Sequence, residues 1–222
     1  NSAHGRGISL AISEELLGMG INVITMGNHV WNNSEIHKVL DATSSVIRPA
    51  NLSPLSPGFG STIVDVAGEK LGVINLMGRV SMDPCDCPFE AAKREVEKLK
   101  KETNNIIVDF HAEATSEKVA MGYFLDGMVS AVVGTHTHIQ TADEKILPGG
   151  TAYITDVGMT GAYVSVLGMD KDIILKKFTT GLPQRFEPAE GRAQFNGVLI
   201  DISSNGCAKS IERINIVENQ VI

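Results

Sequence analysis

Apolar residues recur at two different spacings along this chain, and each spacing predicts a type of element. In residues 8–19 and 88–103 they return every three or four positions, which is typical of a helix with one buried face. Shorter apolar runs rich in β-branched residues, at 21–26 and 105–110, predict buried strands. The remaining predicted elements are helices at 34–40 (with Ser34 as N-cap) and 116–125, strands at 45–47, 129–133 and 151–155, and hairpins pairing 61–66 with 70–76 and 196–202 with 210–217. Residues 170–179 fit either a strand or a helix.

The order of these elements predicts the fold class. Strands and helices alternate through the first two thirds of the chain, which indicates a layered α/β fold. The last third carries mostly strand signals, so the sheets are expected to be mixed. At 222 residues the chain is long enough to bury a substantial core, and we treat residues 1–222 as a single domain.

Composition and charge narrow the partners. The formal net charge is −7, which argues against tight binding to duplex nucleic acid, because such binding relies on Lys and Arg neutralising phosphates. A small phosphorylated substrate is still compatible, since bound metal ions would reverse the local potential. No apolar run is long enough to span a bilayer, and no signal peptide is evident.

The cysteines indicate a compartment. Cys85, Cys87 and Cys207 are odd in number and lack the spacing of a disulfide framework, which favours a reducing, cytoplasmic location. The Cys85 and Cys87 pair lies between two prolines and is read as a loop rather than a metal site.

Polar residues follow three predicted strands at the points where the apolar runs end. They are Asn28 and His29, then His111, then His136 and His138. In open α/β sheets the ligand site lies off the carboxyl ends of the strands, so these motifs are expected at one edge of the sheet. Imidazoles and an amide oxygen, with no thiolate, suit a catalytic metal better than a structural zinc. A single histidine at a strand end is more often a hydrogen-bonded polar residue, and only the convergence favours a metal site.

Other polar residues are candidates for secondary roles. His29 directly follows Asn28 and is expected to project over the site as a general acid, or else to orient a ligand. Arg48 and Asn51 could contact substrate, whereas Arg79 is better explained as a surface or supporting residue. Glu113 could contact substrate or orient a ligand histidine, and Asp156 ends another strand with its role open.

Several motifs together resemble a known family. The triplet Gly27-Asn28-His29 is similar to the third motif of the calcineurin-like metallophosphoesterases. The chain resembles the YmdB-like family of bacterial phosphodiesterases in the segments 26–31 (MGNHVW), 48–51 (RPAN), 75–79 (NLMGR), 108–117 (VDFHAEATSE), 134–143 (GTHTHIQTAD) and 156–161 (DVGMTG). The likeness runs over nearly the whole chain, to about residue 213.

The resemblance implies a fold, a cofactor and roles for residues. The fold would be a four-layer α/β/β/α sandwich that holds two divalent ions, iron or manganese or else magnesium. Asn28, His111 and His136 would hold one ion, His138 the other, and His29 would be the acid. Asn1 matches the Asn of the family's Gly-Glu-Asn motif and would also lie at the metals. The family's first strand with its Gly-Asp motif, and the Glu before Asn1, have no counterpart, so the chain is read as truncated at its N-terminus.

The activity implied is hydrolysis of cyclic nucleotides, most of all the 2′,3′-cyclic type, by a hydroxide activated between two metal ions. The alternatives are a phosphomonoesterase, or a regulatory protein of RNA turnover or biofilm control in which catalysis is secondary. The substrate partner would be a small cyclic nucleotide or another phosphodiester. No residue pattern in the sequence indicates the oligomeric state. Because soluble proteins commonly form symmetric homo-oligomers, a homodimer or higher oligomer is expected.

Overall fold

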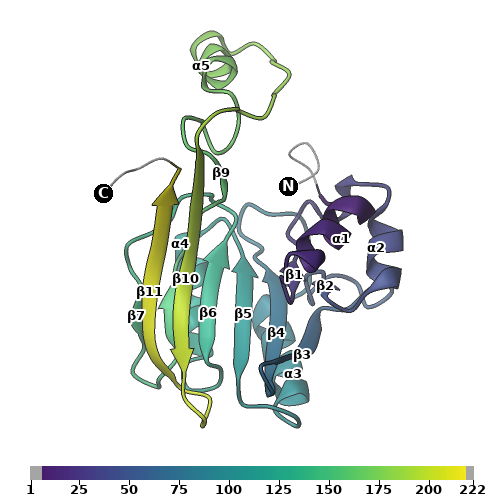
Figure 1. Ribbon diagram of the computed structural model, residues 1–222, viewed down its shortest axis with the longest axis vertical. Coiled ribbons are helices and arrows are strands. Elements are labelled where there is room, and N and C mark those ends of the chain that lie inside the picture. Colours follow the sequence, from purple (N-terminus) through teal and green to yellow (C-terminus); the bar gives the residue numbers. More distant parts are fainter. Residues whose placement is uncertain (1–6, 219–222) are drawn as a thin grey trace.

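A six-stranded mixed sheet forms the centre of the protein. The structure is a computed structural model that describes residues 7–218 (Figure 1). The strands lie in the order β3-β4-β5-β6-β8-β7, in which β4, β5, β6 and β8 run parallel and the two edge strands run antiparallel to their neighbours. Their bounds are β3 Ser61–Val66, β4 Glu69–Met77, β5 Ile106–His111, β6 Ala131–Thr135, β7 Lys145–Ile146 and β8 Ala152–Ile154. The mixed sheet predicted from the sequence is confirmed.

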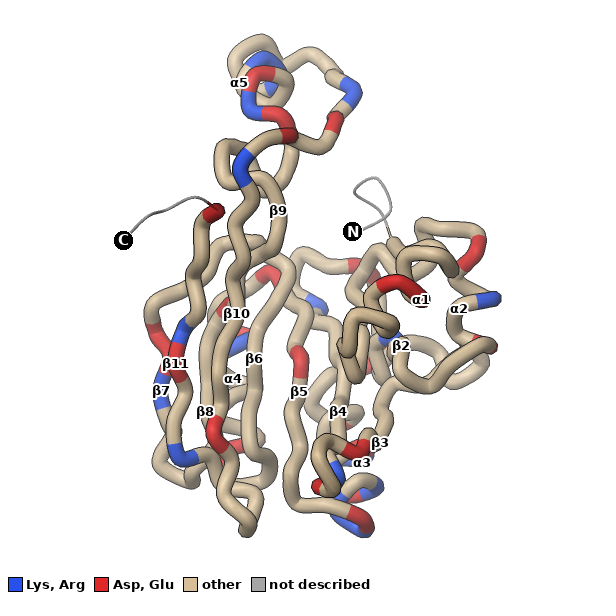
Figure 2. The backbone as a smooth tube through the Cα atoms, viewed as in Figure 1, with Lys and Arg blue, Asp and Glu red and all other residues tan. Residues whose placement is uncertain are grey.

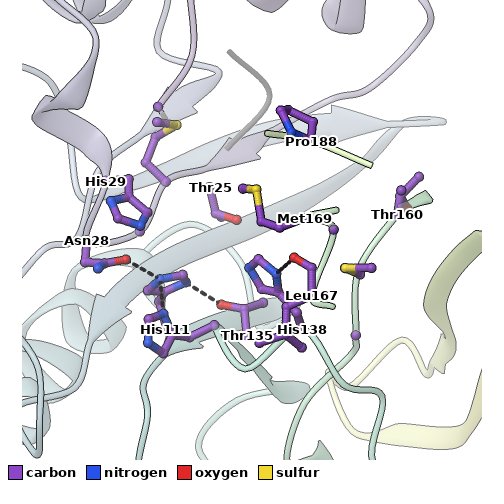
Figure 3. Close-up of a pocket in the computed structure, with 18 of the residues that line it drawn as sticks. Thr25, Asn28, His29, His111, Thr135, His138, Thr160, Leu167, Met169 and Pro188 are labelled. Carbon is purple, nitrogen blue, oxygen red and sulfur yellow. Dashed lines mark hydrogen bonds between the residues drawn. The ribbon is translucent and has the colours of Figure 1, made fainter. Parts of the chain in front are cut away.

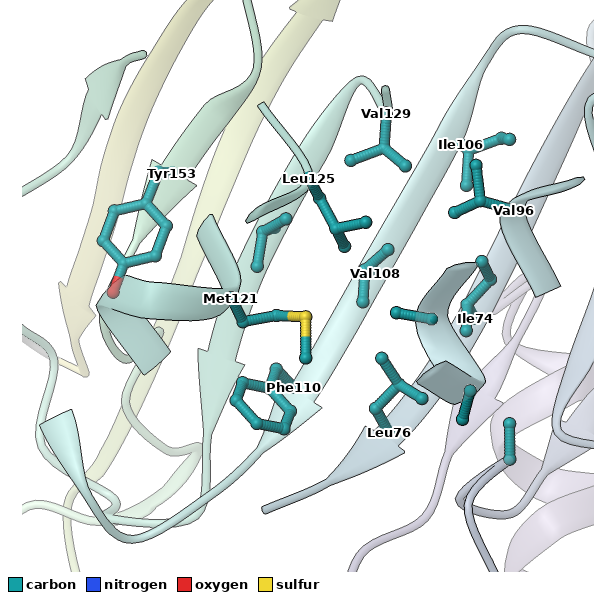
Figure 4. Packing of buried hydrophobic residues seen from close by; sticks show 14 of the residues in the cluster. Ile74, Leu76, Val96, Ile106, Val108, Phe110, Met121, Leu125, Val129 and Tyr153 are labelled. Carbon is teal, nitrogen blue, oxygen red and sulfur yellow. The ribbon is translucent and has the colours of Figure 1, made fainter. Parts of the chain in front are cut away.

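One face of this sheet is covered by two helices, α3 (Pro88–Leu99) and α4 (Thr115–Phe124). Side chains alternate across a strand, so β5 sends Ile106, Val108 and Phe110 to this face, where all three are fully buried. Figure 4 shows them packed among the apolar side chains of the two helices. Burying each large apolar side chain contributes roughly 1.5–3 kcal/mol, so this layer stabilises the fold.

The opposite face of the sheet is covered in two separate places. On one side lies the antiparallel hairpin of β10 (Ala193–Ile202) and β11 (Ala208–Val217). The short strand β9 (Gly161–Ala162) pairs with the other edge of β10 and completes a three-stranded sheet. The hairpin approaches closely because the buried contact there is made by the small residues Ala131, Ala152 and Ala208. The register of β10 against β11, from Gln194 opposite Val217 to Ile202 opposite Ala208, confirms the predicted pairing of the last two strands.

The N-terminal segment covers the other part of that face. It contains α1 (Leu10–Gly18), β1 (Ile24–Thr25), the 3-10 turn η1 (Val30–Asn32), α2 (Ile36–Ala42) and β2 (Val46–Ile47), with β1 and β2 paired in parallel. Asn75 of β4 ties it to the large sheet, because its amide donates to the carbonyls of Met26 and Ile47. The layers are thus α1/α2, small sheets, large sheet and α3/α4. This is the expected α/β/β/α order, with the second β layer in two pieces within residues 7–218.

Several elements differ from the prediction: β7 and β9 were not expected, and other elements begin or end at different residues. The strand expected at 21–26 shortens to Ile24–Thr25, because its partner β2 offers only two residues to pair with. Ser34 does not cap α2; the N-cap is Glu35, whose backbone N–H is bound by the side chain of Asn33 at 2.9 Å. Helix α3 ends at Leu99 and not at 103.

Residues 170–179, left open between strand and helix, belong to α5 (Lys171–Thr180). Asp170 caps its start by accepting from the N–H groups of Asp172 and Ile173, each at 3.0 Å, and Gly181 ends it with φ 68°. Figure 1 shows α5 at the tip of an arm, residues 160–192, that projects away from the sheets.

Charged residues of both signs are mixed along the chain in the view of Figure 2. In Figure 2 the Lys and Arg positions alternate with Asp and Glu along α3, α5 and β11, and they form no continuous basic stripe in this view. Among residues 7–218, none of the helices has the length and apolar character needed to cross a membrane.

Candidate active site

A pocket of about 490 Å³ opens where β1, β5 and β6 end. The register aligns Met77 of β4, His111 of β5 and Thr135 of β6 in one row, so the residues that follow these strands share an edge. The five described residues that were predicted to form the metal centre and the general acid all line this pocket: Asn28, His29, His111, His136 and His138. The sixth, Asn1, lies outside the described residues.

Three of these side chains meet at one point. Asn28 Oδ1 lies 3.0 Å from His111 Nε2, and His136 Nδ1 lies 3.1 Å from the same nitrogen. Neighbouring ligands of a metal with bonds of about 2.1 Å stand about 3 Å apart, so the spacing fits one shared ion. Figure 3 shows His138 set apart from this group, with its Nδ1 donating to the carbonyl of Leu167 at 3.1 Å. Within residues 7–218, no three His, Cys, Asp or Glu side chains form a ligand group by themselves, and the third donor that meets the two imidazoles is the amide oxygen of Asn28.

Hydrogen bonds to the outer sides of the two rings determine which ring nitrogens face the point where the three side chains meet. The Thr135 hydroxyl donates to Asp109 at 2.8 Å, so towards His111 Nδ1, at 2.9 Å, it can only accept. His111 Nδ1 therefore carries the hydrogen, and its Nε2 presents a lone pair. Glu113 lies 3.3 Å from His136 Nε2 and leaves Nδ1 of that ring as the lone-pair atom. An amide oxygen and two nitrogen lone pairs facing one another repel unless a cation lies between them.

Electrostatics keep both rings in the ligand form. Burial, with the neighbouring charges of His136 and Lys118, lowers the pKa of His111 to about 3. Burial also lowers the pKa of His136, although Glu113 opposes this. Beneath them, burial raises the pKa of Asp109 to about 6 despite the hydroxyl groups of Thr25 and Thr135. Both imidazoles are thus neutral at physiological pH, which is the form that binds metal.

Close packing explains one glycine of the motif. A Cβ atom on Gly27 would lie 2.3 Å from His111 Nε2. Only glycine lets the chain before Asn28 pass so near the imidazole.

The loop that carries His136 and His138 is strained and held in place. Both residues have positive φ, 103° and 65°, which L side chains rarely adopt. Between them, Thr137 donates its N–H and its hydroxyl to Asp156 Oδ2, at 3.0 and 2.7 Å. Lys118 of α4 donates to the same oxygen at 2.7 Å, and both charged groups are almost fully buried. This contact assigns Asp156, whose role was open, to holding the histidine loop.

His29 stands at the rim of the pocket, before η1. The side-chain amide of Asn32 donates to His29 Nδ1 at 2.9 Å, so in the neutral ring the hydrogen lies on Nε2. The ring thus has a proton to give from the nitrogen that does not contact Asn32.

Two of the expected substrate residues lie elsewhere. The guanidinium of Arg48 is buried and donates to the carbonyls of Pro49, Ser56 and Pro57 at 2.9 to 3.1 Å. The buried Asn51 joins the backbone of Met77 at 2.7 and 2.9 Å. Neither residue is among those that line the pocket; in this structure both hold loops through backbone groups, and their contact with substrate stays a prediction. Glu113 instead contacts His136, as its orienting alternative requires.

The sequence reasoning missed Lys118, Thr135 and Asp109. A signal existed for Asp109, which stands two residues before His111 and so shares its face of β5. Lys118 gave none, because it lies on a helix from the opposite face of the sheet.

Comparison with known proteins points to one family. A family model described as "YmdB-like protein" matches residues 1–214. The 2′,3′-cyclic-nucleotide 2′-phosphodiesterase of Bacillus subtilis (strain 168) is 50% identical over 222 residues, which cover 100% of this chain and 84% of that protein.

Two solved structures are similar over most of the chain. A hypothetical protein from Thermus thermophilus superposes with a TM-score of 0.91 at 40% identity, covering 97% of this chain and 84% of the other. A structure described as a novel phosphatase of Mycoplasma pneumoniae superposes with a TM-score of 0.88 at 38% identity, covering 96% and 78%.

Proposed function

Because this chain belongs to the YmdB-like family, we propose that it is a metal-dependent phosphodiesterase that opens 2′,3′-cyclic nucleotides. The observation that carries the metal dependence is the meeting of Asn28 Oδ1, His111 Nε2 and His136 Nδ1 within about 3 Å. The substrate class is supported by the name of the Bacillus subtilis relative, which is 50% identical over the whole chain.

The donor set suggests how two divalent ions would be held. Asn28, His111 and His136 would hold one ion, and His138 would hold the other. Because Nδ1 of His138 donates to the carbonyl of Leu167, Nε2 of that ring carries the lone pair that would bind the ion. Imidazole and amide donors suit iron and manganese, with magnesium as the weaker alternative. When bound, such ions would supply Lewis-acid charge beside the phosphate and lower the pKa of water, so that hydroxide is available at neutral pH to attack phosphorus.

The chain's own groups then orient the substrate and move the proton. The side-chain amide nitrogen of Asn28 and the ring of His29 border the place where the phosphate would lie, so they can stabilise its negative charge. His29 would donate the hydrogen on Nε2 to the departing ribose oxygen. Asn32, by bonding Nδ1 at 2.9 Å, fixes the tautomer that this requires.

The test is metal content together with hydrolysis of 2′,3′-cyclic AMP and bis(p-nitrophenyl) phosphate with added manganese. We expect His111→Ala to lose metal and turnover, because it removes the nitrogen that both other ligands contact. His37→Ala is the matched control, since this exposed histidine of α2 does not line the pocket. Turnover that survives His111→Ala, or that never depends on metal, would sink the proposal.

A phosphomonoesterase is the second candidate, favoured by the description of the Mycoplasma pneumoniae structure as a phosphatase. Comparing p-nitrophenyl phosphate with bis(p-nitrophenyl) phosphate separates the two. Faster hydrolysis of the monoester would favour the phosphatase. For location we propose the cytoplasm, supported by the three cysteines, none of which forms a disulfide.

A further inference from the structure

The pocket has two unlike sides. One side carries the amide and imidazole groups described above. The other is built by residues 158–162, 167–169 and 188–189, which form the base of the arm that carries α5. Figure 3 shows Met169 and Pro188 across the pocket from Asn28 and His29, with Leu167 beside His138. Met159, Leu167, Met169 and Pro188 form what we call the apolar wall.

The apolar wall is a built structure and not a loose loop. Val166 and Met169 pair across a tight turn, and Met169 pairs in turn with Pro188. Leu167 has φ 55° and Gly168 φ 92°, the left-handed pair expected at such a turn. Ala189 N–H donates to the carbonyl of Gly168 at 2.9 Å, which joins the two strands of the arm. The turn therefore presents Leu167, 45% exposed, at a fixed position.

One hydrogen bond fixes the apolar wall relative to the candidate metal ligands. His138 Nδ1 donates to the carbonyl of Leu167 at 3.1 Å. This bond holds the turn next to the imidazole. A phosphate held at the histidines would have its organic substituent directed across the pocket. The volume of about 490 Å³ lies in the range of small-ligand sites, which hold more than a phosphate alone.

We propose that the apolar wall is the seat of the nucleobase, and that it holds the base through contact with its flat face. This rests on the proposed function and adds to it the part of the protein that selects the organic group. Thioether and aliphatic side chains favour a flat, polarisable ring over water. Among the described pocket residues of the arm base, Thr160 alone has a polar side chain, so few groups are available to read base edges.

Selectivity should therefore follow ring area and not base identity. Purine and pyrimidine cyclic nucleotides are expected to be hydrolysed with kcat/KM values within about tenfold of each other, because only contact area distinguishes them. A cyclic phosphodiester without a base should be a poor substrate.

The experiment compares 2′,3′-cyclic AMP with glycerol 1,2-cyclic phosphate, which has the same five-membered phosphodiester and no base. Met169→Ala should lower kcat/KM for 2′,3′-cyclic AMP about tenfold, as expected from losing contact with one or two methylene-sized groups. It should change kcat/KM for the glycerol ester less than twofold. Leu167→Asn is a second variant that keeps the turn, because Asn tolerates positive φ, and it should act in the same direction. Met19→Ala, at a methionine of which 70% is exposed outside the pocket, is the control.

Equal loss on both substrates, no loss on either, or a preference above a hundredfold for one base would overturn the seat. Binding of 3′-AMP and of glycerol phosphate, measured by calorimetry, separates this from the proposed function. If neither diester is hydrolysed, the proposed function fails. The seat still stands when 3′-AMP binds at least tenfold more tightly than glycerol phosphate and Met169→Ala removes that difference. It fails when the two bind alike.

Discussion

The two faces of β5 differ in character: one packs into the apolar core and the other faces the pocket. Ile106, Val108 and Phe110 point to α3 and α4 and are fully buried in an apolar core. Asp109 and His111 point the other way, to the pocket, and each is bonded to the Thr135 hydroxyl. One face follows the rule that apolar groups are removed from water. The other face buries polar side chains, and each of them has a hydrogen-bond partner. Burying such groups contributes little to stability, so this face is better explained by function.

The largest effect should come from the pocket side without any change in stability. His29→Ala is expected to lower turnover between about a hundredfold and ten-thousandfold, the usual contribution of a general acid. Metal content should stay as in the wild type, because the three donors that meet at His111 Nε2 are those of Asn28, His111 and His136 and do not include His29. Melting temperature should change little, because the bond from His29 to Asn32 is exposed. Elemental analysis beside steady-state kinetics measures both, with His37→Ala as control. If metal disappears along with turnover, His29 is a ligand or a structural residue.

The opposite result is expected from the helix-covered face. Phe110→Ala should lower the free energy of unfolding by about 3–5 kcal/mol, because it opens a cavity in the core. Urea denaturation measures this loss. Phe178→Ala, at a side chain 76% exposed on α5, should change it by less than about 0.5 kcal/mol. The folded fraction of Phe110→Ala should bind metal normally, and a large drop in metal affinity would mean that the two faces are not separable.

The ion pair of Lys118 and Asp156 joins the two sides, because it reaches from α4 to the histidine loop. Asp156→Asn should cost about 3 kcal/mol of stability, since it leaves a buried ammonium group unpaired. It should also weaken metal binding, because Thr137 loses the carboxylate that accepts two hydrogen bonds. Adding Lys118→Met should restore part of the stability but not the metal affinity. Recovery of both would show that the pair supports the fold alone.

An effect that is absent at neutral pH concerns the metal-free protein in acid. The folded pKa of His111, about 3, lies below the ordinary value of 6.5, so at acid pH the unfolded chain binds a proton that the folded chain does not. Its contribution to stability is fully present above pH 6.5 and is lost as pH falls from there towards 3. His111→Ala should flatten the fall of unfolding free energy with pH in that window. An unchanged slope would show that His111 takes up a proton in the folded protein.

Much of the fold could be predicted because it depends on local pattern. The alternation in β5 and the apolar spacing of α3 follow directly from residue order. The strand predicted at 21–26 could not be sized, because its length depends on the two residues that β2 offers as partners. Arg48 and Asn51 resemble substrate-binding residues in sequence, and only the carbonyls folded around them show that their donors are used internally.

Residue types at fixed spacings were enough to identify the family, the α/β class and the histidines that end the strands. They could not show which atoms of those histidines face one another, because that depends on Thr135, Glu113 and the carbonyl of Leu167, brought from other elements. Nor could they show that the arm base faces the histidines. Contacts between residues far apart in the chain arise when strands align, and no local pattern encodes them.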